Sequence, residues 1–281
     1  MVEIISIIEN TKKEGSPLQN EHGLSLFLTY NDKSYLIDTG ASDKFIENSK
    51  ALGIDLQKLG AVVVSHNHYD HIGGLEAFFT VNKGAKVYIK RAAQSKFFSK
   101  RRFYFKNISA PNFLFKKFSD RFIFIDEKLE IDKNVWLMSN IVKNEHYSCK
   151  DSRLLERKNL IFRADTFKHE LFIVIEEENH VIIVSSCSHN GIVNIARSVQ
   201  QEFPHKPIKN IVGGFHLKSL SREMNDVEAQ KYTADIADTL DNLCSSKIYT
   251  CHCTGLPAFN AMKEKLPEKL EYLATGDKLS L

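Results

Sequence analysis

The sequence predicts an α/β fold, and three observations support this. The chain has 281 residues, of which 43% are hydrophobic and 26% charged, which is typical of a globular protein with a large core. Short apolar runs rich in β-branched residues, such as Ala-Val-Val-Val at 61–64, indicate buried strands. A longer stretch with apolar residues at helical spacing, 226–243, lies between two such runs. We therefore expect one α/β domain over residues 1–281.

In the first half of the chain, strands are predicted from the N-terminus onward. A hairpin is expected about Asn31 and Asp32, a favourable turn pair. A helix should follow the turn at residues 38–40, and another should begin after Gly73 and Gly74, which permit a tight turn. The predicted strands are 2–8, 23–30, 33–37, 61–64, 86–89, 122–125 and 135–138, and the predicted helices are 43–52 and one starting at 75.

In the second half, a hairpin across residues 176–179 should join strands 171–175 and 181–184. Strands are also predicted at 208–212 and 247–250, and helices at 226–243 and from Pro257, because proline is tolerated in the first turn of a helix. A histidine follows four of the predicted strands: His66, His189, His216 and His252. Because ligands bind outside the carboxyl ends of strands in α/β sheets, we expect these histidines to converge on one site.

The most informative segment is residues 65–74, Ser-His-Asn-His-Tyr-Asp-His-Ile-Gly-Gly, which directly follows the strand at 61–64. Imidazole nitrogen and carboxylate oxygen are ligands for zinc, iron and manganese. In an extended segment His66 and His68 point to the same side and could close on one metal ion. Asp70 and His71 follow as the chain turns, and they could reach a second ion beside the first.

The pattern His66-x-His68-x-Asp70-His71, followed by Gly-Gly-Leu at 73–75, resembles the signature of the metallo-β-lactamase-fold hydrolases. Residues 35–40 (Tyr-Leu-Ile-Asp-Thr-Gly) resemble the family's strand that ends in Asp-x-Gly. Residues 187–194, 213–217 and 251–255 resemble one branch, the dihydropterin-ribofuranosylaminobenzene phosphate synthase-like proteins. The resemblance implies a four-layer αββα sandwich, with two sheets face to face, helices outside and the site at one edge.

The resemblance also implies a metal-dependent hydrolase, or a transferase of similar chemistry. One or two divalent ions are expected, with zinc first and manganese or iron as alternatives. His66, His68 and His189 would hold one ion, and Asp70, His71 and His252 a second. Bound metal would lower the pKa of water to about 7 and stabilise a developing oxyanion. Asp70 and His216 are the predicted catalytic residues; His216 could protonate the leaving group, contact the substrate or bind metal.

Several neighbouring residues have open or minor roles. Asp38 could orient a metal-binding imidazole or merely stabilise its own turn. The place of the family's bridging aspartate is occupied by Ser-Ser-Cys-Ser at 185–188, so Cys187 or His189 would take its role. We expect the cysteines at 251 and 253 to be packing residues. The remaining histidines are expected at the surface: His146, His169, His180 and His205.

A basic and aromatic segment spans residues 90–121, between the first-half strands and the later ones. Its basic residues include Lys100, Arg101 and Arg102, which stand among Phe97, Phe98, Phe103, Tyr104 and Phe105. The segment could be a lid that attracts a small anionic substrate, since arginine pairs with phosphate and phenylalanine stacks on rings. It could instead bind single-stranded nucleic acid, or be an ordinary amphipathic segment with a solvated face.

Composition limits the compartment and the partners. Residues 1–6 lack the zones of a signal peptide, no apolar run approaches membrane-spanning length, and the five cysteines form no regular framework. These features predict a cytoplasmic protein without a membrane partner. The net charge of +3 is too small to imply nucleic-acid binding by itself. The alternatives to a small-molecule hydrolase are a nuclease, a diiron redox protein and a non-catalytic metal-binding or sensor protein.

Overall fold

The computed structural model describes residues 1–281, and the chain forms two compact units. Unit 1 comprises residues 1–126, 153–169 and 274–281, and unit 2 comprises residues 127–152 and 170–273. No helix in either unit combines the length and the apolar composition that crossing a membrane requires.

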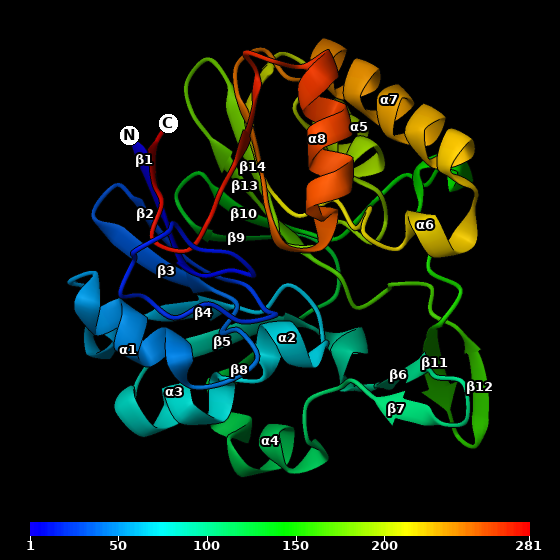
Figure 1. The fold of residues 1–281 in the computed structure, drawn as a ribbon. Coiled ribbons are helices and arrows are strands. Elements are labelled where there is room, and N and C mark those ends of the chain that lie inside the picture. Colours follow the sequence, from blue (N-terminus) through cyan, green and yellow to red (C-terminus); the bar gives the residue numbers. More distant parts are fainter. The chain divides into compact units, whose positions relative to one another are not determined.

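Unit 1 is built on a seven-stranded mixed sheet in the order β18-β1-β2-β3-β4-β5-β8 (Figure 1). Its strands are β1 (Val2–Ile8), β2 (Ser25–Tyr30), β3 (Lys33–Ile37), β4 (Ala61–Val63), β5 (Lys86–Lys90), β8 (Phe122–Ile125) and β18 (Lys278–Ser280). Its helices are α1 (Lys44–Ala51), α2 (Tyr69–Ile72), α3 (Leu75–Val81) and α4 (Asn112–Lys117), with 3-10 turns at Leu56–Lys58, Arg91–Gln94 and Ser119–Arg121.

The helices of unit 1 pack on one face of this sheet. Phe45 of α1, Phe78 of α3 and Leu114 of α4 share a buried cluster with Leu36 of β3 and Val62 of β4. Residues of the opposite face, such as Ile37 and Val63, are buried as well. Burial of both faces explains why the central strands are continuous apolar runs rather than alternating ones.

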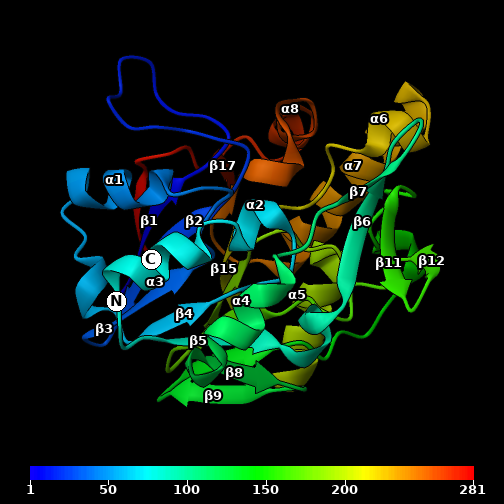
Figure 2. The same cartoon turned by 90° about the horizontal axis from the view of Figure 1, so that it is seen from below.

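Unit 1 also contains a small antiparallel sheet in the order β12-β11-β6-β7 (Figure 2). Its strands are β6 (Lys96–Lys100), β7 (Phe105–Asn107), β11 (Leu154–Lys158) and β12 (Ile161–Ala164). The predicted basic segment 90–121 therefore divides into a β6–β7 hairpin and a following part that joins the core. In that part Leu114 is buried, and so is Arg121, whose guanidinium donates to the backbone carbonyls of Ala85 and Asn82.

Unit 2 carries a second seven-stranded sheet in the order β17-β16-β15-β14-β13-β10-β9. Its strands are β9 (Leu129–Asp132), β10 (Val135–Met138), β13 (Phe172–Glu176), β14 (Val181–Ser185), β15 (Ile208–Gly213), β16 (Ile248–Thr250) and β17 (Leu270–Tyr272). Its helices are α5 (Ile192–Glu202), α6 (Leu220–Glu223), α7 (Asp226–Leu243) and α8 (Leu256–Lys265), with 3-10 turns at Glu145–Tyr147 and His252–Thr254.

Helices α5, α7 and α8 cover one face of this sheet. Val199, Leu240 and Met262, one from each helix, pack with Ile183 of β14 and Ile211 of β15. Strands β14, β15 and β16 are parallel neighbours, so their carboxyl ends meet at one edge of the sheet. The segments with the predicted histidines of the second half leave the sheet at this edge.

Candidate metal centre

In unit 1, three histidines of the segment after β4 converge below the surface. The ring centroids of His66 and His68 are 4.5 Å apart, and those of His66 and His71 are 4.2 Å apart. All three side chains are buried. Burial and the neighbouring His169 lower the pKa of His68 to about 3, so its imidazole is neutral at physiological pH. A neutral imidazole is the form that binds a metal ion.

Asp38, at the end of β3, fixes the orientation of two of these rings. Its carboxylate can only accept, so the Nδ1 of His71 must donate to it, at 2.7 Å. The Ser65 hydroxyl also donates to Asp38, at 2.7 Å, and therefore accepts from the Nδ1 of His66, at 2.9 Å. Both rings thus carry their proton on Nδ1. The lone pair that could bind metal is on Nε2 in each, an arrangement typical of metal sites.

Asp70 lies at the outer side of the same segment. One of its carboxylate oxygens is 3.9 Å from the Nε2 of His71 and 3.4 Å from the Nε2 of His22. The backbone carbonyls of Asp70 and His71 accept from Leu24 and Thr39, which ties the segment to the ends of β2 and β3. Asp70 is thereby held beside the histidine group.

Gly73 and Gly74 let this segment turn against its neighbours. A Cβ atom at Gly73 would lie 2.4 Å from the carbonyl oxygen of Ala41, and one at Gly74 would lie 2.3 Å from that of Thr39. The predicted need for glycine here is confirmed, and its reason is close backbone approach.

His169 is not the surface residue that the sequence suggested, because it is buried beside the unit 1 histidines. Its ring stacks on Phe97 at 3.7 Å and lies 5.3 Å from that of His68. Its Nδ1 accepts from the backbone N–H of Asn67 at 3.1 Å, so its Nε2 donates to Asp165 at 3.0 Å. Because both nitrogens are hydrogen-bonded, His169 holds the segment and is not placed among the candidate ligands. The other three predicted surface histidines, at 146, 180 and 205, are at least partly exposed.

In unit 2, three strand ends bring a second group of donors together. His189 follows β14, His216 follows β15 and His252 follows β16. The rings of His189 and His216 lie 4.2 Å apart. Ligand atoms of Cys149, His189 and His216 all lie within 4.8 Å of one another, and so do those of Cys187, His252 and Cys253. Thiols therefore accompany the histidines of this unit.

Two of these groups have shifted pKa values. Burial lowers the pKa of His216, but the sulfur atoms of Cys149 and Cys253 outweigh burial and raise it well above its ordinary value. Burial raises the pKa of the Cys253 thiol, but hydrogen bonds with Cys187 and His216 and the nearby His252 outweigh burial and hold it well below its usual range.

Glu170 positions the His189 segment and was not singled out in the sequence. The buried carboxylate accepts from the backbone N–H of His189 at 2.6 Å and of Asn190 at 2.9 Å, and from the Asn190 amide at 2.7 Å. The backbone approaches closely at Gly191, since a Cβ atom there would lie 2.0 Å from the carbonyl oxygen of Tyr147. A single acidic residue before a strand carries no periodic signal, so only the folded structure identifies Glu170.

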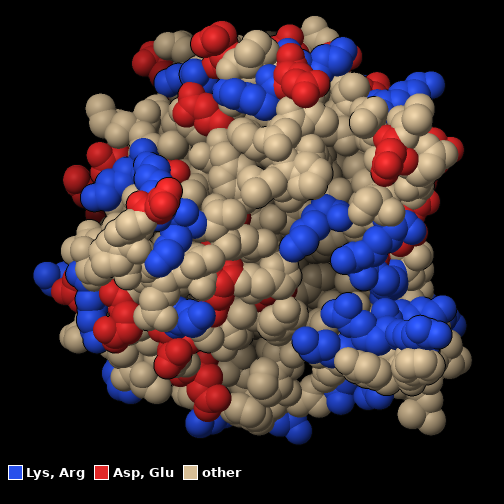
Figure 3. All heavy atoms as spheres, viewed as in Figure 1, with Lys and Arg blue, Asp and Glu red and all other residues tan.

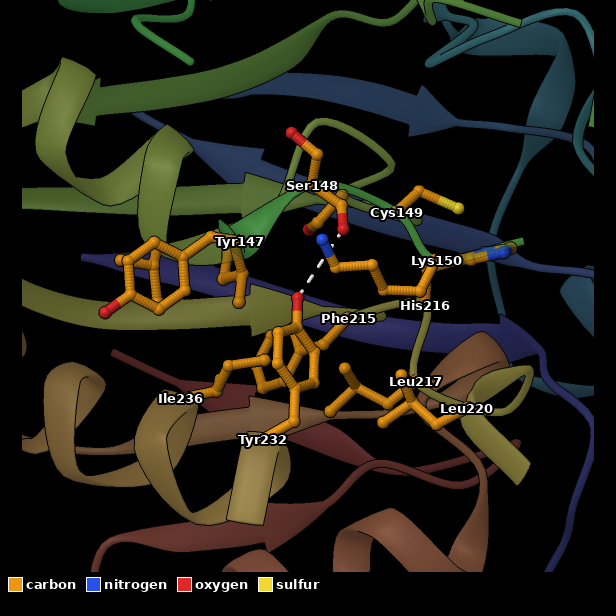
Figure 4. A pocket seen from close by; sticks show the side chains of 13 residues that line it. Tyr147, Ser148, Cys149, Lys150, Phe215, His216, Leu217, Leu220, Tyr232 and Ile236 are labelled. Carbon is orange, nitrogen blue, oxygen red and sulfur yellow. Dashed lines mark hydrogen bonds between the residues drawn. The ribbon is translucent and has the colours of Figure 1, made fainter. Parts of the chain in front are cut away.

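His216 also lines a narrow pocket of unit 2, of about 10 Å³, roughly the space of one water molecule (Figure 4). Cys149, Lys150 and Tyr232 line it as well. The Tyr232 hydroxyl donates to the carbonyl of Ser148 across the pocket at 3.5 Å.

The predicted substrate residues Lys100, Arg101 and Arg102 are exposed at the tip of the β6–β7 hairpin in unit 1. Basic side chains gather over this sheet in Figure 3. The hairpin contacts residues 65–74, hereafter the metal segment, because the ammonium of Lys106 lies 4.9 Å from the ring centre of Tyr69. Phe103 and Tyr104 at the tip are 85% and 62% exposed, so these aromatic side chains are not core residues.

Comparison with known proteins identifies the family. A family model of the metallo-beta-lactamase superfamily matches residues 19–198. The chain belongs to this superfamily. The crystal structure of Tm1679, a metal-dependent hydrolase of the beta-lactamase superfamily, is similar with a TM-score of 0.82 and 27% identity over 100% of this chain and 99% of that one. This likeness confirms the predicted metallo-β-lactamase type of fold.

Other proteins are similar in sequence or in fold. A synthase from Methanocaldococcus jannaschii, for 7,8-dihydropterin-6-methyl-4-(beta-D-ribofuranosyl)-aminobenzene-5'-phosphate, is 25% identical over 98% of this chain and 95% of its own length. This match supports the predicted resemblance to that branch. Zinc-bound PqqB from Methylobacterium extorquens shares the fold, with a TM-score of 0.59 and 9% identity over 99% of this chain and 100% of that one.

The metallo-beta-lactamase superfamily binds divalent metal ions, and the donors described above fit such an ion. In unit 1, Nε2 atoms of buried imidazoles with a fixed tautomer stand beside a carboxylate. In unit 2, imidazoles stand beside thiols. Nitrogen, carboxylate oxygen and sulfur are the ligands that zinc takes in proteins.

Proposed function

We propose that this protein is a metal-dependent hydrolase, or a transferase of similar chemistry, that acts on a small anionic substrate. The observation that carries the proposal is the group of buried histidines in unit 1, two of which have Nδ1 engaged by Asp38 and Ser65. Metal-binding histidines commonly donate their other ring N–H to a carboxylate or another acceptor, which is the arrangement of these two rings. Superfamily membership supports the same conclusion.

The proposed ligands are His66, His68 and His189 for one ion and Asp70, His71 and His252 for a second. A bound divalent ion lowers the pKa of water and stabilises negative charge that develops on oxygen. Asp38 and Ser65 would keep two ligand rings in position throughout the reaction. His216 would donate a proton to the leaving group.

The proposed substrate is anionic and phosphorylated. The similar synthase from M. jannaschii has a phosphorylated aromatic compound in its name. In this chain the basic tip at residues 100–102 lies next to exposed Phe103 and Tyr104, which suits a phosphate together with a flat ring. Lys106, close to Tyr69, would add positive charge beside the metal segment.

The experiment is a turnover assay on metal-free protein reloaded with zinc or manganese. The substrates are a phosphomonoester, a phosphodiester and a lactone. We expect metal-dependent hydrolysis of at least one phosphorylated compound. Activity confined to the iron form, and then only with dioxygen or an electron donor, would contradict the proposal and favour a redox protein.

A nuclease is the second candidate, because the exposed aromatic and basic side chains of the hairpin tip are those that bind single strands. It predicts tight, salt-dependent binding of single-stranded RNA or DNA by the metal-free protein. Turnover of small phosphoesters without such binding would favour the first candidate.

A further inference from the structure

Two cysteine thiols and one histidine meet at the carboxyl ends of β14 and β16, within unit 2. The Sγ atoms of Cys187 and Cys253 and a ring nitrogen of His252 all lie within 4.8 Å of one another. All three residues are buried. We propose that Cys187 and Cys253 are metal ligands and that they form, with His252, a thiolate-containing part of the metal centre. This inference depends on the proposed function only for the assignment of His252.

The distances suit a single ion. With Zn–S bonds of about 2.3 Å and Zn–N bonds of about 2.0 Å, the ligand atoms of a tetrahedral site lie roughly 3.5–3.8 Å apart. Because these ligand atoms lie within 4.8 Å of one another, they need to approach one another by at most about 1.3 Å. Small rotations of the cysteine χ1 angles provide a shift of that size.

The backbone is shaped around the sulfur of Cys253. A Cβ atom at Gly214 would lie 2.5 Å from this sulfur, so only glycine leaves room for it there. The backbone N–H of His216 donates to the same sulfur at 3.3 Å. A sulfur that accepts a hydrogen bond carries negative charge well, which is what a metal-bound thiolate requires.

His252 is held in a conformation that costs energy. It has a left-handed backbone, with φ of 52°, and begins the 3-10 turn His252–Thr254. Thr254 fixes this turn, because its hydroxyl accepts from the backbone N–H of Phe215 and contacts the hydroxyl of Thr250. Such strain persists where the structure needs a side chain in one place, and here it places His252 and Cys253 together.

Cys244 is another buried thiol of this unit, and like the sulfur of Cys253, which lies 3.5 Å from the carbonyl oxygen of Cys187, it contacts backbone carbonyls. Its sulfur donates to the backbone carbonyls of Lys209, at 3.2 Å, and of Lys247, at 3.6 Å. Burial raises the pKa of this thiol. Unlike Cys187 and Cys253, Cys244 belongs to neither of the two ligand groups of unit 2 described above. Cys244 is therefore a matched control for Cys187 and Cys253.

The proposal narrows the choice of metal. Thiolate ligands favour zinc, cobalt and iron over manganese and magnesium. The proposal gives Cys253 the role of a metal ligand, where the sequence predicted a packing residue. It also gives Cys187 the position of the bridging aspartate that the superfamily resemblance led us to expect.

The test is a titration of reduced, metal-free protein with Co²⁺, followed by absorption. We expect a thiolate-to-cobalt charge-transfer band in the near ultraviolet. Cys187→Ser and Cys253→Ser should each weaken the band, and the double variant should abolish it. Cys244→Ser and Cys149→Ser should leave it intact, which separates this donor set from the Cys149–His189–His216 set.

Three outcomes would overturn the proposal. The first is visible cobalt bands in the wild type without the charge-transfer band, which would mean nitrogen and oxygen ligands only. The second is a band that survives in the double variant, and the third is a band that disappears in Cys149→Ser. The wild-type spectrum needs no variant, so misfolding of a variant does not weaken the test. Absence of hydrolysis with an intact band would contradict the proposed function and leave the thiolate ligands standing.

Discussion

At the scale of single residues, left-handed backbone conformations cluster at the candidate centre. Asp38, Ser188, His216 and His252 all have positive φ, between 49° and 58°. Asparagine, aspartate and histidine adopt this conformation more readily than other residues, and only Ser188 and Phe167 among the non-glycine residues with positive φ are of another type. Strained residues at functional positions persist because surrounding contacts hold them, and each of these four lies just after a strand.

The first prediction concerns Asp38, whose carboxylate accepts from His71 and Ser65. Asp38→Asn should weaken zinc binding by about 10–100-fold, because an amide is a poorer acceptor and no longer raises the basicity of His71. Competition with a chromophoric chelator would measure this loss. Asp43→Asn is the control, since Asp43 is exposed and makes no capping hydrogen bond in α1. Equal affinity of the Asp38 variant and wild type would show that Asp38 only stabilises its turn.

At the scale of elements, the β13–β14 hairpin of unit 2 is held by a charged contact with the segment before β15. Glu176 at the end of β13 accepts from the ammonium of Lys206 at 2.8 Å and from the indole N–H of Trp136 at 3.0 Å. The bond from Lys206 is the main cause of the lowered pKa of Glu176. A lowered carboxyl pKa stabilises the fold at pH values above the unfolded pKa.

The second prediction therefore concerns pH. Glu176→Gln should reduce the free energy of unfolding by about 0.5–1 kcal/mol at neutral pH. The difference from wild type should shrink below the ordinary carboxyl pKa of 4.5 and vanish as the pH falls through the lowered value. Urea denaturation at several pH values would measure it. The exposed neighbour Glu178, changed to glutamine, should show no such pH dependence, and a pH-independent effect at Glu176 would argue against the ionic contribution.

The third prediction concerns the β6–β7 hairpin. Replacing Lys100, Arg101 and Arg102 by glutamine should raise KM for a phosphorylated substrate and leave the metal content unchanged. The effect should shrink as salt rises, because exposed charges are screened over about 10 Å at 0.1 M. A neutral substrate should respond little. The matched control replaces three exposed lysines of the same unit, Lys50, Lys58 and Lys116. If KM and single-strand binding both ignore the triple substitution, the hairpin tip is an ordinary solvated surface.

At the scale of the whole molecule, the proposed ligands belong to both units of the chain, His68 to unit 1 and His189 to unit 2. The fourth prediction follows from assigning them to one ion. His68→Ala and His189→Ala should each lose the same equivalent of zinc, and the double variant should lose no more than either one. Elemental analysis after dialysis would measure this, with His205→Ala as the control at an exposed position. Additive losses would mean that each unit binds its own ion.

Sequence patterns predicted the main elements well, because these carry strong periodicity. Predicted strands 2–8, 33–37, 122–125 and 135–138 and helix 226–243 have those bounds in the structure. The predicted hairpin about Asn31 and Asp32 is confirmed, and both residues have positive φ as a tight turn requires. Local signals of this kind depend only on nearby residues, so a single sequence reveals them.

Contacts between residues far apart in the chain could not be predicted from the sequence. Strands β11 and β12 were not predicted, because Glu156, Arg157 and Lys158 interrupt their apolar pattern, and they form a sheet only by pairing with β6. The predicted surface position of His169 is wrong, since nothing in the local sequence indicates that its ring stacks on Phe97. The grouping of Cys187 with Cys253 depends on the parallel pairing of β14, β15 and β16, which joins residues far apart in the chain.

Asn67, the residue between the first two histidines, has a consequence for engineering. Its amide donates to the carbonyl of Ala93 at 2.6 Å, and its carbonyl oxygen accepts from the backbone N–H of Ala110 at 2.7 Å. One side chain therefore fixes both the entry and the exit of the segment that carries the hairpin tip. Because lengthening a loop between fixed ends costs little, we expect that residues can be inserted at the exposed tip, 101–104, without moving the segment 65–74. Exchange of the tip residues would therefore show whether this hairpin influences the choice of substrate.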